Sequence, residues 1–231
     1  MITCTPPPIL GSEWVTSWPM LRLPMWSVLW HTIQDFITLI SPAAIPYLEQ
    51  MARQAHALTV ERFGHTMQLY IPLYLSNICS NACVYCGFSR SNKIHRRRLT
   101  AEEVDREAEA ILRLGYKHLL LVSGESEKAT PASYYEEMTR RLRPLFSQLS
   151  LEVQPLTTEE YARLHEAGIG AVYVYQETYD EQAYPTYHPA GRKADYRYRL
   201  ETPDRIGQAN MQKIGIGALL GLENWRVDSV F

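Results

Sequence analysis

Three of the four cysteines in the chain, Cys79, Cys83 and Cys86, lie within eight residues of one another. Thiolates at this spacing, C-x3-C-x2-C, repel each other unless a cation lies between them. The spacing therefore predicts a bound metal ion or an iron-sulfur cluster. A four-iron cluster normally takes four cysteines, and this loop supplies three, which would leave one iron open to an exogenous ligand.

A structural zinc ion is the alternative. Zinc sites are usually four-coordinate, so a histidine such as His65 or His95 would have to join the three cysteines. Zinc knuckles mostly use C-x2-C pairs, however, and no second Cys or His pair follows at the usual distance. The local spacing thus favours a cluster, and the rest of the chain supplies the context in which to judge the motif.

The composition is that of an ordinary globular protein. The chain has 231 residues, of which 46% are hydrophobic and 21% charged, so it can bury a sizeable core. A net charge of -2 argues against nucleic acid or a membrane surface as the main partner. With Cys4 alone near the start, the cysteines form no disulfide framework, and a reducing, cytoplasmic location is expected.

Residues 1–40 differ from the rest of the chain, being rich in proline, tryptophan and other apolar residues. A membrane span needs about 20 predominantly apolar residues, and every window of that length is interrupted by Arg22, Pro24, His31 or Asp35. No basic stretch followed by a small-residue cleavage site is present, so a signal peptide is not predicted. We interpret this segment as an irregular N-terminal extension that could hold a helix over residues 26–40.

From residue 41 to 231, helical and strand patterns alternate. Apolar runs predict strands at residues 70–75, 117–126, 151–156, 171–175 and 214–223. Helical spacing predicts helices at residues 41–64, 100–115, 131–149, 157–166 and 203–213. Two of them begin with capping boxes, Thr100 with Glu103 and Thr157 with Glu160. Alternating helices and almost wholly apolar strands indicate an α/β fold with parallel strands and outer helices. The helix at residues 41–64, which precedes the first strand, should cover one end of the sheet.

Polar groups follow each predicted strand. The cysteines follow the first strand, and the later strands end at Glu125, Gln154, Gln176 with Glu177, and Glu223. Ligands of parallel sheets gather at the carboxyl ends of the strands, so these side chains should face one mouth. A zinc site does not account for this convergence, which therefore favours the cluster. The basic run at residues 93–98 is interpreted as a solvated turn, or as a group that steadies an anionic ligand or the cluster.

With Tyr85 just before the last cysteine, the loop resembles the cluster loop of the radical S-adenosylmethionine (SAM) enzymes. From residue 41 to 231 the chain resembles a narrower family, the tyrosine lyases of thiamine biosynthesis, or 2-iminoacetate synthases. The matching stretches are SPAAIPYLEQMA, YIPLYLSNICSNACVYCGFS, HLLLVSGE, LEVQPL, VYQETY, RLETPDRIGQA and KIGIGALLGLENWRVDS. The resemblance implies a radical SAM (β/α) TIM-type barrel over residues 41–231, which is incomplete because eight strands would need roughly 90 more residues.

The resemblance also implies the site residues. Cys79, Cys83 and Cys86 would bind a 4Fe-4S cluster whose open iron holds SAM. Glu125 would meet the SAM ammonium group, and the nucleoside would lie close to the backbone at Gly215 and Gly217, unless these glycines only pack the barrel. Further cofactor contacts are assigned to Tyr85, Gln176 and Glu223. Catalytic roles are assigned to Glu177, Arg199 and Arg205.

The two arginines suit the carboxylates of SAM and tyrosine, although either could instead form an ion pair with Glu201 or Asp204. In the family, a 5'-deoxyadenosyl radical abstracts hydrogen from the tyrosine amino group, and the Cα–Cβ bond breaks. The products are p-cresol and 2-iminoacetate (dehydroglycine), which feeds the thiazole moiety of thiamine. The implied partners are L-tyrosine, thiazole synthase and an electron donor such as flavodoxin or ferredoxin.

Two other functions remain open from the sequence. The hydrogenase-maturation tyrosine lyase shares the cluster loop and a Gln-Glu-Thr-Tyr-like stretch, but it carries a further C-terminal cysteine motif. The other is a metal- or cluster-binding fragment without catalysis. An incomplete barrel leaves one side of the active site open, which weakens the expectation of turnover by this chain alone.

Overall fold

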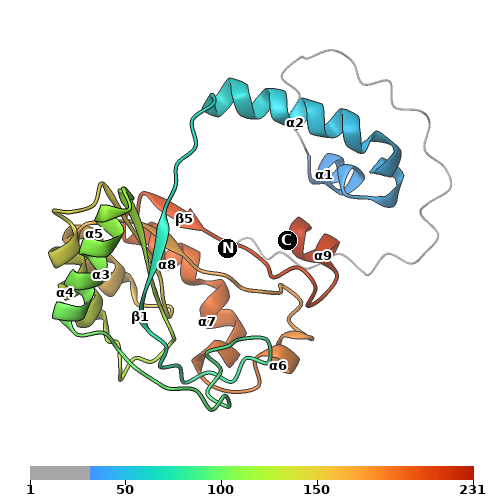
Figure 1. The fold of residues 1–231 in the computed structure, drawn as a ribbon. Helices are drawn as coiled ribbons and strands as arrows, with labels where there is room; N and C mark the ends of the chain where they lie inside the picture. Colours follow the sequence, from blue (N-terminus) through green and yellow to red (C-terminus); the bar gives the residue numbers. More distant parts are fainter. Residues whose placement is uncertain (1–31) are drawn as a thin grey trace.

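The computed structural model describes residues 32–231, and five strands form its single sheet (Figure 1). All neighbouring strands are parallel, and their order in the sheet follows the chain. The strands are β1 (Ile71–Ser76), β2 (His118–Ser123), β3 (Gln148–Glu152), β4 (Ile169–Tyr173) and β5 (Lys213–Gly215). Parallel neighbours joined through helices are the repeating unit of α/β barrels. The predicted fold class is confirmed.

One helix directly precedes each of the strands β2 to β5: α3 (Ala101–Arg113), α4 (Ala132–Leu142), α5 (Thr158–Ala167) and α8 (Thr202–Gln208). In Figure 1, α3, α4 and α5 lie together on one side of the sheet. Both predicted capping boxes are present, at the starts of α3 and α5. Each threonine hydroxyl accepts from the backbone N–H three residues later, which satisfies a donor that the helix leaves free.

The core lies between the sheet and these helices. One row of paired residues crosses the sheet through Leu73, Leu121, Leu151 and Val172, all of which are buried. Tyr135 and Met138 of α4 and Leu164 of α5 are fully buried and pack in the same cluster. The apolar runs of β2, β3 and β4 thus reflect strands that are buried on both faces, whereas β1 is partly exposed and β5 is largely exposed. The carboxyl ends of all five strands consequently meet at one edge.

Several predicted boundaries are wrong. β3 starts at Gln148 and ends at Glu152, earlier than the predicted strand at residues 151–156. Residues 148–150 pair with β2, although two of the three are polar and do not form an apolar run. The predicted helix at residues 131–149 accordingly ends at Leu142. β5 has three residues instead of the ten predicted, so Gly217 and Glu223 lie beyond it. A single bridge between Glu177 and Ala218 continues the pairing.

The helix predicted at residues 41–64 is divided. Residues 42–47 form a 3-10 helix, η1 (Pro42–Tyr47), with Pro46 inside it, and α2 (Leu48–Phe63) follows up to Gly64. Proline lacks the N–H that an α-helical turn needs, which explains the break. The expectation that this helix covers the sheet is wrong, because α2 buries no side chain and lies away from the sheet (Figure 1).

The remaining helices are short. α1 (Ile33–Leu39) corresponds to the second half of the helix predicted at residues 26–40, and the first 31 residues lie outside the described part of the chain. The segment between β4 and α8 contains α6 (Tyr184–Tyr187), η2 (Arg192–Ala194) and α7 (Tyr196–Leu200). The last helix is α9 (Trp225–Val230). Figure 1 shows α6 and α7 at the same end of the sheet as the loop that follows β1.

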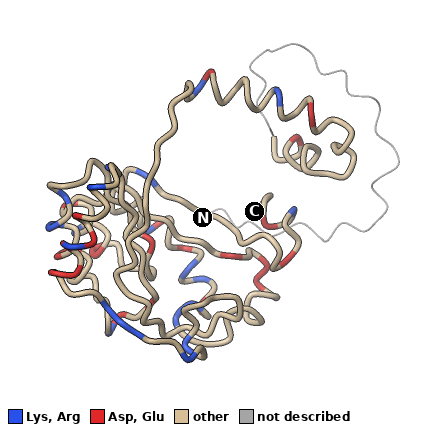
Figure 2. Tube along the Cα trace, viewed as in Figure 1, with Lys and Arg blue, Asp and Glu red and all other residues tan. Residues whose placement is uncertain are grey.

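Charged residues of both signs are interspersed along the helices beside the sheet (Figure 2). Across residues 32–231, no helix is both long and apolar enough to cross a membrane.

Candidate active site

The cysteine loop leaves the carboxyl end of β1 and is held by a segment more than 100 residues away. The backbone N–H of Ala82 donates to the carbonyl of Ala190 at 2.9 Å, and that of Val84 donates to Tyr187 at 3.1 Å. Gly191 has a φ of 94° and lies directly against Asn81, where a Cβ would collide with the loop. Only glycine fits this close approach without strain.

All three cysteines carry free thiols, with Cys83 buried and the other two partly exposed. Burial raises the pKa of Cys79 and raises that of Cys83 to about 11, and the neighbouring thiols add to both shifts. The thiolates therefore need a bound cation to form at neutral pH.

The three sulfurs suit a cluster better than a single ion. In residues 32–231, no three Cys, His, Asp or Glu side chains converge closely enough to hold one metal ion. Each cysteine of a 4Fe-4S cluster binds a different iron atom, so three thiols spread along one loop fit that group.

A buried ion pair lies beside this loop. Nη1 of Arg199 donates to Oε1 of Glu125 at 2.8 Å, and the two side chains are only 6% and 13% exposed. Nδ2 of Asn81 donates to the other carboxylate oxygen at 2.7 Å. Burial by itself raises the pKa of Glu125, but the charges of Arg199 and Lys193 outweigh burial and lower it. Glu125 is therefore a carboxylate at neutral pH.

A second buried ion pair joins Lys193 and Glu177, with 2.7 Å between Nζ and Oε1. Glu177 has a φ of 75°, which is rare for a residue with a side chain and is typical of functional sites. The backbone N–H of Lys193 donates to Oδ1 of Asn81 at 3.0 Å, so Asn81 links the two pairs. The site thus holds two carboxylates and two cations in alternation.

A tyrosine and a histidine complete this cluster of side chains. Burial and the charge of Lys193 lower the pKa of His188 to about 4, so its ring is neutral and carries one N–H. Nδ1 lies 3.1 Å from the carbonyl of Tyr184, which can only accept, so Nδ1 is the donor. Nε2 must then accept from the hydroxyl of Tyr85, at 2.7 Å. This bond fixes Tyr85 next to Cys86.

The carboxyl ends of β4 and β5 bound a small cavity of about 170 Å³. It is lined by Val174, Gln176, Tyr179, Arg199, Leu200, Pro203, Ile216 and Phe231. Nε2 of Gln176 donates to the carbonyl of Tyr196, and its backbone N–H donates to Gly217. The cavity is therefore continuous with the ion pair of Arg199 and has both apolar and polar walls.

Other predicted residues lie apart from the ion pairs. Arg205 stacks on Tyr198 at 4.0 Å and donates to the carbonyls of Leu156 and Tyr198, so these contacts are structural. Glu223 accepts from the hydroxyl of Tyr187. Gly215 lies directly against the ring of Tyr173. The structure therefore brings Glu125, Glu177 and Arg199 to the cysteine loop that carries Tyr85, places Gln176 in the small cavity lined by Arg199, and leaves Arg205 and Glu223 outside the paired charges.

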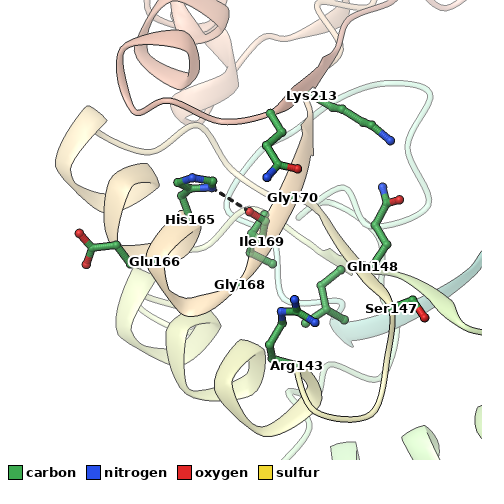
Figure 3. Close-up of a pocket in the computed structure, with 11 residues that line it drawn as sticks. Arg143, Ser147, Gln148, His165, Glu166, Gly168, Ile169, Gly170 and Lys213 are labelled. Carbon is green, nitrogen blue, oxygen red and sulfur yellow. Dashed lines mark hydrogen bonds between the residues drawn. The ribbon is translucent and has the colours of Figure 1, made fainter.

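A larger cavity of about 390 Å³ lies at the opposite, amino ends of β3, β4 and β5 (Figure 3). It is lined by polar groups that include Arg143, His165 and Lys213, and Nδ1 of His165 donates to the carbonyl of Ile169 at 3.2 Å. None of the predicted site residues lines it. Its position at the wrong end of the strands separates it from the candidate active site.

Lys193, Asn81 and His188 were missed by sequence reasoning. Lys193 and His188 lie in a polar loop with no periodic pattern, and nothing in the sequence distinguishes them from solvated residues. Asn81 sits inside the cysteine motif, and its burial to 1% exposure is the signal that only the fold supplies.

Comparison with known proteins agrees with this geometry. The profile of the Radical SAM superfamily matches residues 73–230, from β1 to α9. The chain belongs to the radical SAM superfamily. This membership confirms the predicted cofactors, a 4Fe-4S cluster and SAM, and the matched region includes the cysteine loop.

Two radical SAM relatives are 52% identical to the chain. They are the 2-iminoacetate synthases of Escherichia coli, over 199 residues, and of Salmonella typhimurium, over 195 residues. These alignments cover 86% and 84% of this chain, but only 53% and 52% of the relatives. The chain therefore spans about half the length of the curated relatives that it matches.

Solved radical SAM structures have the same fold. The crystal structure of HydG, a maturase of the FeFe-hydrogenase, has a TM-score of 0.80 at 31% identity and covers 86% of this chain and 44% of its own. Methylornithine synthase (PylB) has a TM-score of 0.70 at 23% identity, covering 86% of this chain and 58% of its own. The latter similarity supports the barrel fold only.

Proposed function

We propose that this chain belongs to a 2-iminoacetate synthase, a radical SAM lyase that cleaves the Cα–Cβ bond of L-tyrosine to give 2-iminoacetate and p-cresol. The observation that carries the proposal is the 52% identity over 199 residues, which include the cysteine loop and both buried ion pairs. An enzyme of this kind would supply the two-carbon imine that becomes part of the thiazole of thiamine.

The paired charges suit an amino-acid ligand. SAM and tyrosine each carry an ammonium and a carboxylate, and the site offers Glu125 and Glu177 to the first and Arg199 and Lys193 to the second. An incoming zwitterion exchanges with the internal pairs, so that each buried charge keeps a partner of opposite sign. Charge-assisted and bidentate bonds of this type orient the ligand as well as bind it.

When bound, the cluster supplies the electron that cleaves SAM and so starts hydrogen abstraction from the substrate. The chain's own residues place the reactants. Gln176 and the small cavity at the ends of β4 and β5 hold the nucleoside or the tyrosine ring, since the walls combine apolar side chains with an amide. Tyr85, fixed by neutral His188, closes the loop side of the site. Such placement can account for many kcal/mol of a barrier.

The hydrogenase-maturation lyase remains the second candidate, because HydG has the same fold at 31% identity. The higher identity to the thiamine enzymes favours the first proposal. The two also differ in the metal they need, since the maturase carries an auxiliary cluster. That cluster uses a further C-terminal cysteine motif, and Cys4 is the one cysteine of residues 1–231 outside the loop, so iron content does not separate the two candidates in this chain.

Anaerobic reconstitution with iron and sulfide tests the proposal. We expect the reduced protein to show a cluster EPR signal that shifts when SAM is added. The signal should be lost in Cys83→Ala and kept in Cys4→Ala, the cysteine outside the loop. Incubation with SAM, L-tyrosine and a reductant, either dithionite or reduced flavodoxin, should then release p-cresol. Stoichiometric zinc without an EPR signal would overturn the assignment of the loop, and a chain that cleaves SAM to 5'-deoxyadenosine in the presence of L-tyrosine but releases no p-cresol would overturn the assignment of tyrosine.

The proposal includes two protein partners. Reduced flavodoxin or ferredoxin would be the electron donor, and thiazole synthase would accept the product. Faster p-cresol formation with the flavodoxin than with an equal concentration of dithionite would support a protein donor. Co-elution with thiazole synthase in size-exclusion chromatography would support direct transfer of the imine.

A further inference from the structure

The basic run Lys93, His95, Arg96, Arg97 and Arg98 follows the cysteine loop, and only one of its members is half-buried, Arg96. The segment that carries it returns to the carboxyl end of β1. Asn77 accepts from the backbone N–H of Arg97 at 2.8 Å and donates to the carbonyl of His95 at 2.7 Å. An antiparallel bridge between Ser76 and Arg98 completes this attachment. The guanidinium of Arg96 is thereby placed beneath the loop.

The guanidinium donates to four backbone carbonyls. Nη1 contacts Asn77 at 2.7 Å and Phe88 at 2.8 Å. Nη2 contacts Ser89 at 2.6 Å and Asn92 at 3.1 Å. Asn77 lies two residues before Cys79, while Phe88 and Ser89 lie two and three residues after Cys86. One side chain therefore ties the two ends of the cysteine loop together.

The fourth contact extends the tie to a cysteine. Nδ2 of Asn92 donates to the carbonyls of Cys86 and Gly87 at 3.2 and 3.0 Å. The backbone N–H of Ser89 also donates to the carbonyl of Cys86 at 3.0 Å. The planar fork of arginine can satisfy several carbonyls in fixed directions, which a single ammonium group cannot do.

We propose that Arg96 is the positioning residue that holds the cysteine loop in its cluster-binding conformation before the cluster is inserted. The side-chain bonds of Arg96 go to backbone carbonyls and not to the thiols, so it acts through the backbone on both sides of the three cysteines. A loop whose ends are free has to lose conformational entropy when the cluster assembles, and this tie removes part of that cost in advance. The inference rests on the loop being the cluster site and does not depend on tyrosine as the substrate.

Arg96→Lys tests the proposal, with Arg97→Lys as the matched control. Arg97 is an adjacent arginine whose side chain is 54% exposed and pairs with Glu103 at the surface. Both variants keep the positive charge, and only the first loses the four-carbonyl fork. Hydrogen exchange of the metal-free proteins is followed at the amides of Cys86, Ser89 and Asn92, with the amides of β2 as an internal reference.

In Arg96→Lys we expect the loop amides to exchange about tenfold faster or more, because charged hydrogen bonds are lost, while the β2 amides and the thermal midpoint stay close to wild type. After reconstitution, iron should be lost to excess EDTA about tenfold faster. The EPR signal per chain should fall in the same variant, and Arg97→Lys should match the wild type in every measurement.

Three results would overturn the proposal. Unchanged loop exchange and iron retention in Arg96→Lys would show that the tie is dispensable. Equal acceleration in the loop and in β2 would make Arg96 a general stabiliser of the fold. Equal effects in both variants would assign the role to the charge of the basic run. If the wild type takes up no iron, the cluster assignment fails, and the exchange of the metal-free proteins still decides the role of Arg96.

Discussion

Replacing Arg199 by methionine tests whether burial, and not the distance between the charges, determines how much an ion pair contributes to the stability of this protein. The change removes the cation that lies 2.8 Å from Glu125 and the bond that Nε makes to the carbonyl of Tyr175 at 2.7 Å. Glu125 then keeps only the amide of Asn81 as a direct donor. The matched control is Arg192→Met, whose partner Glu127 lies 2.6 Å away at the surface.

The two variants should differ strongly in the free energy of unfolding. Breaking one partner out of a buried pair costs about 3–5 kcal/mol, because the remaining charge is left without compensation. The side chains of Arg199 and Glu125 are 6% and 13% exposed, which places them in this class. Those of Arg192 and Glu127 are 54% and 69% exposed, and such pairs contribute roughly 0–1 kcal/mol. The expected difference of about 3 kcal/mol corresponds to more than a hundredfold in the folding constant.

Urea denaturation of the metal-free proteins under anaerobic, reducing conditions measures both values. A double variant, Glu125→Gln with Arg199→Met, should recover much of the loss, because it removes the unpaired carboxylate. If Arg199→Met costs no more than Arg192→Met, the charges are not held in a low-dielectric environment and the reasoning is refuted. If the double variant is as unstable as the single one, the loss comes from packing and not from the unpaired charge.

Three further outcomes are expected. The pKa of Glu125 is lowered in the fold, so its contribution to stability is complete above its ordinary pKa of 4.5 and is lost as the pH falls below that value. The urea midpoint of Glu125→Gln should therefore depend less on pH below 4.5 than that of the wild type. Burial raises the pKa of Glu152, so Glu152→Gln should raise the urea midpoint at pH 7, and the gain should vanish as the pH falls through 4.5; a gain that persists at pH 3 would contradict this cause. A Cβ on Gly124 would lie 2.6 Å from the carbonyl oxygen of Ile78, next to the first cysteine, so Gly124→Ala should reduce iron uptake severalfold. The control is Gly207→Ala in α8, where the added methyl group meets open space. This variant should leave iron uptake unchanged and gain about 0.5–1 kcal/mol in stability. Equal iron uptake by the two alanine variants would refute the close contact.

Local signals in the sequence determined much of this protein. The cysteine spacing indicates a cluster because thiolates so close together need a cation, whatever the fold. The capping boxes at Thr100 and Thr157 locate two helix starts because the bonds involved span three residues. Apolar strands alternating with helical patterns indicate a parallel sheet, and the rule that ligands bind at its carboxyl edge brings Glu125 and Glu177 to the cysteines.

Boundaries were less well determined, for a physical reason. β3 begins at Gln148 because that residue pairs with His118, and no property of the segment by itself indicates the pairing. β5 is short although the segment 214–223 is apolar and rich in glycine, because strand length depends on the neighbour as well as on the residues. The apolar stripe of α2 was interpreted as a packing face, whereas the helix lies away from the sheet.

Only the tertiary structure decided which charges act together. Glu125 and Arg199 are 74 residues apart, and Asn81 and Lys193 are 112 apart, so their pairing depends on how the chain packs and leaves no periodic trace. The five basic residues from Lys93 to Arg98 look equivalent as a sequence, and the return of that segment to β1 places a single one beneath the cysteine loop. The sequence determined which chemical groups are present and at which edge of the sheet they meet, and the packing determined their partners, because the direction of a buried side chain is set by everything around it.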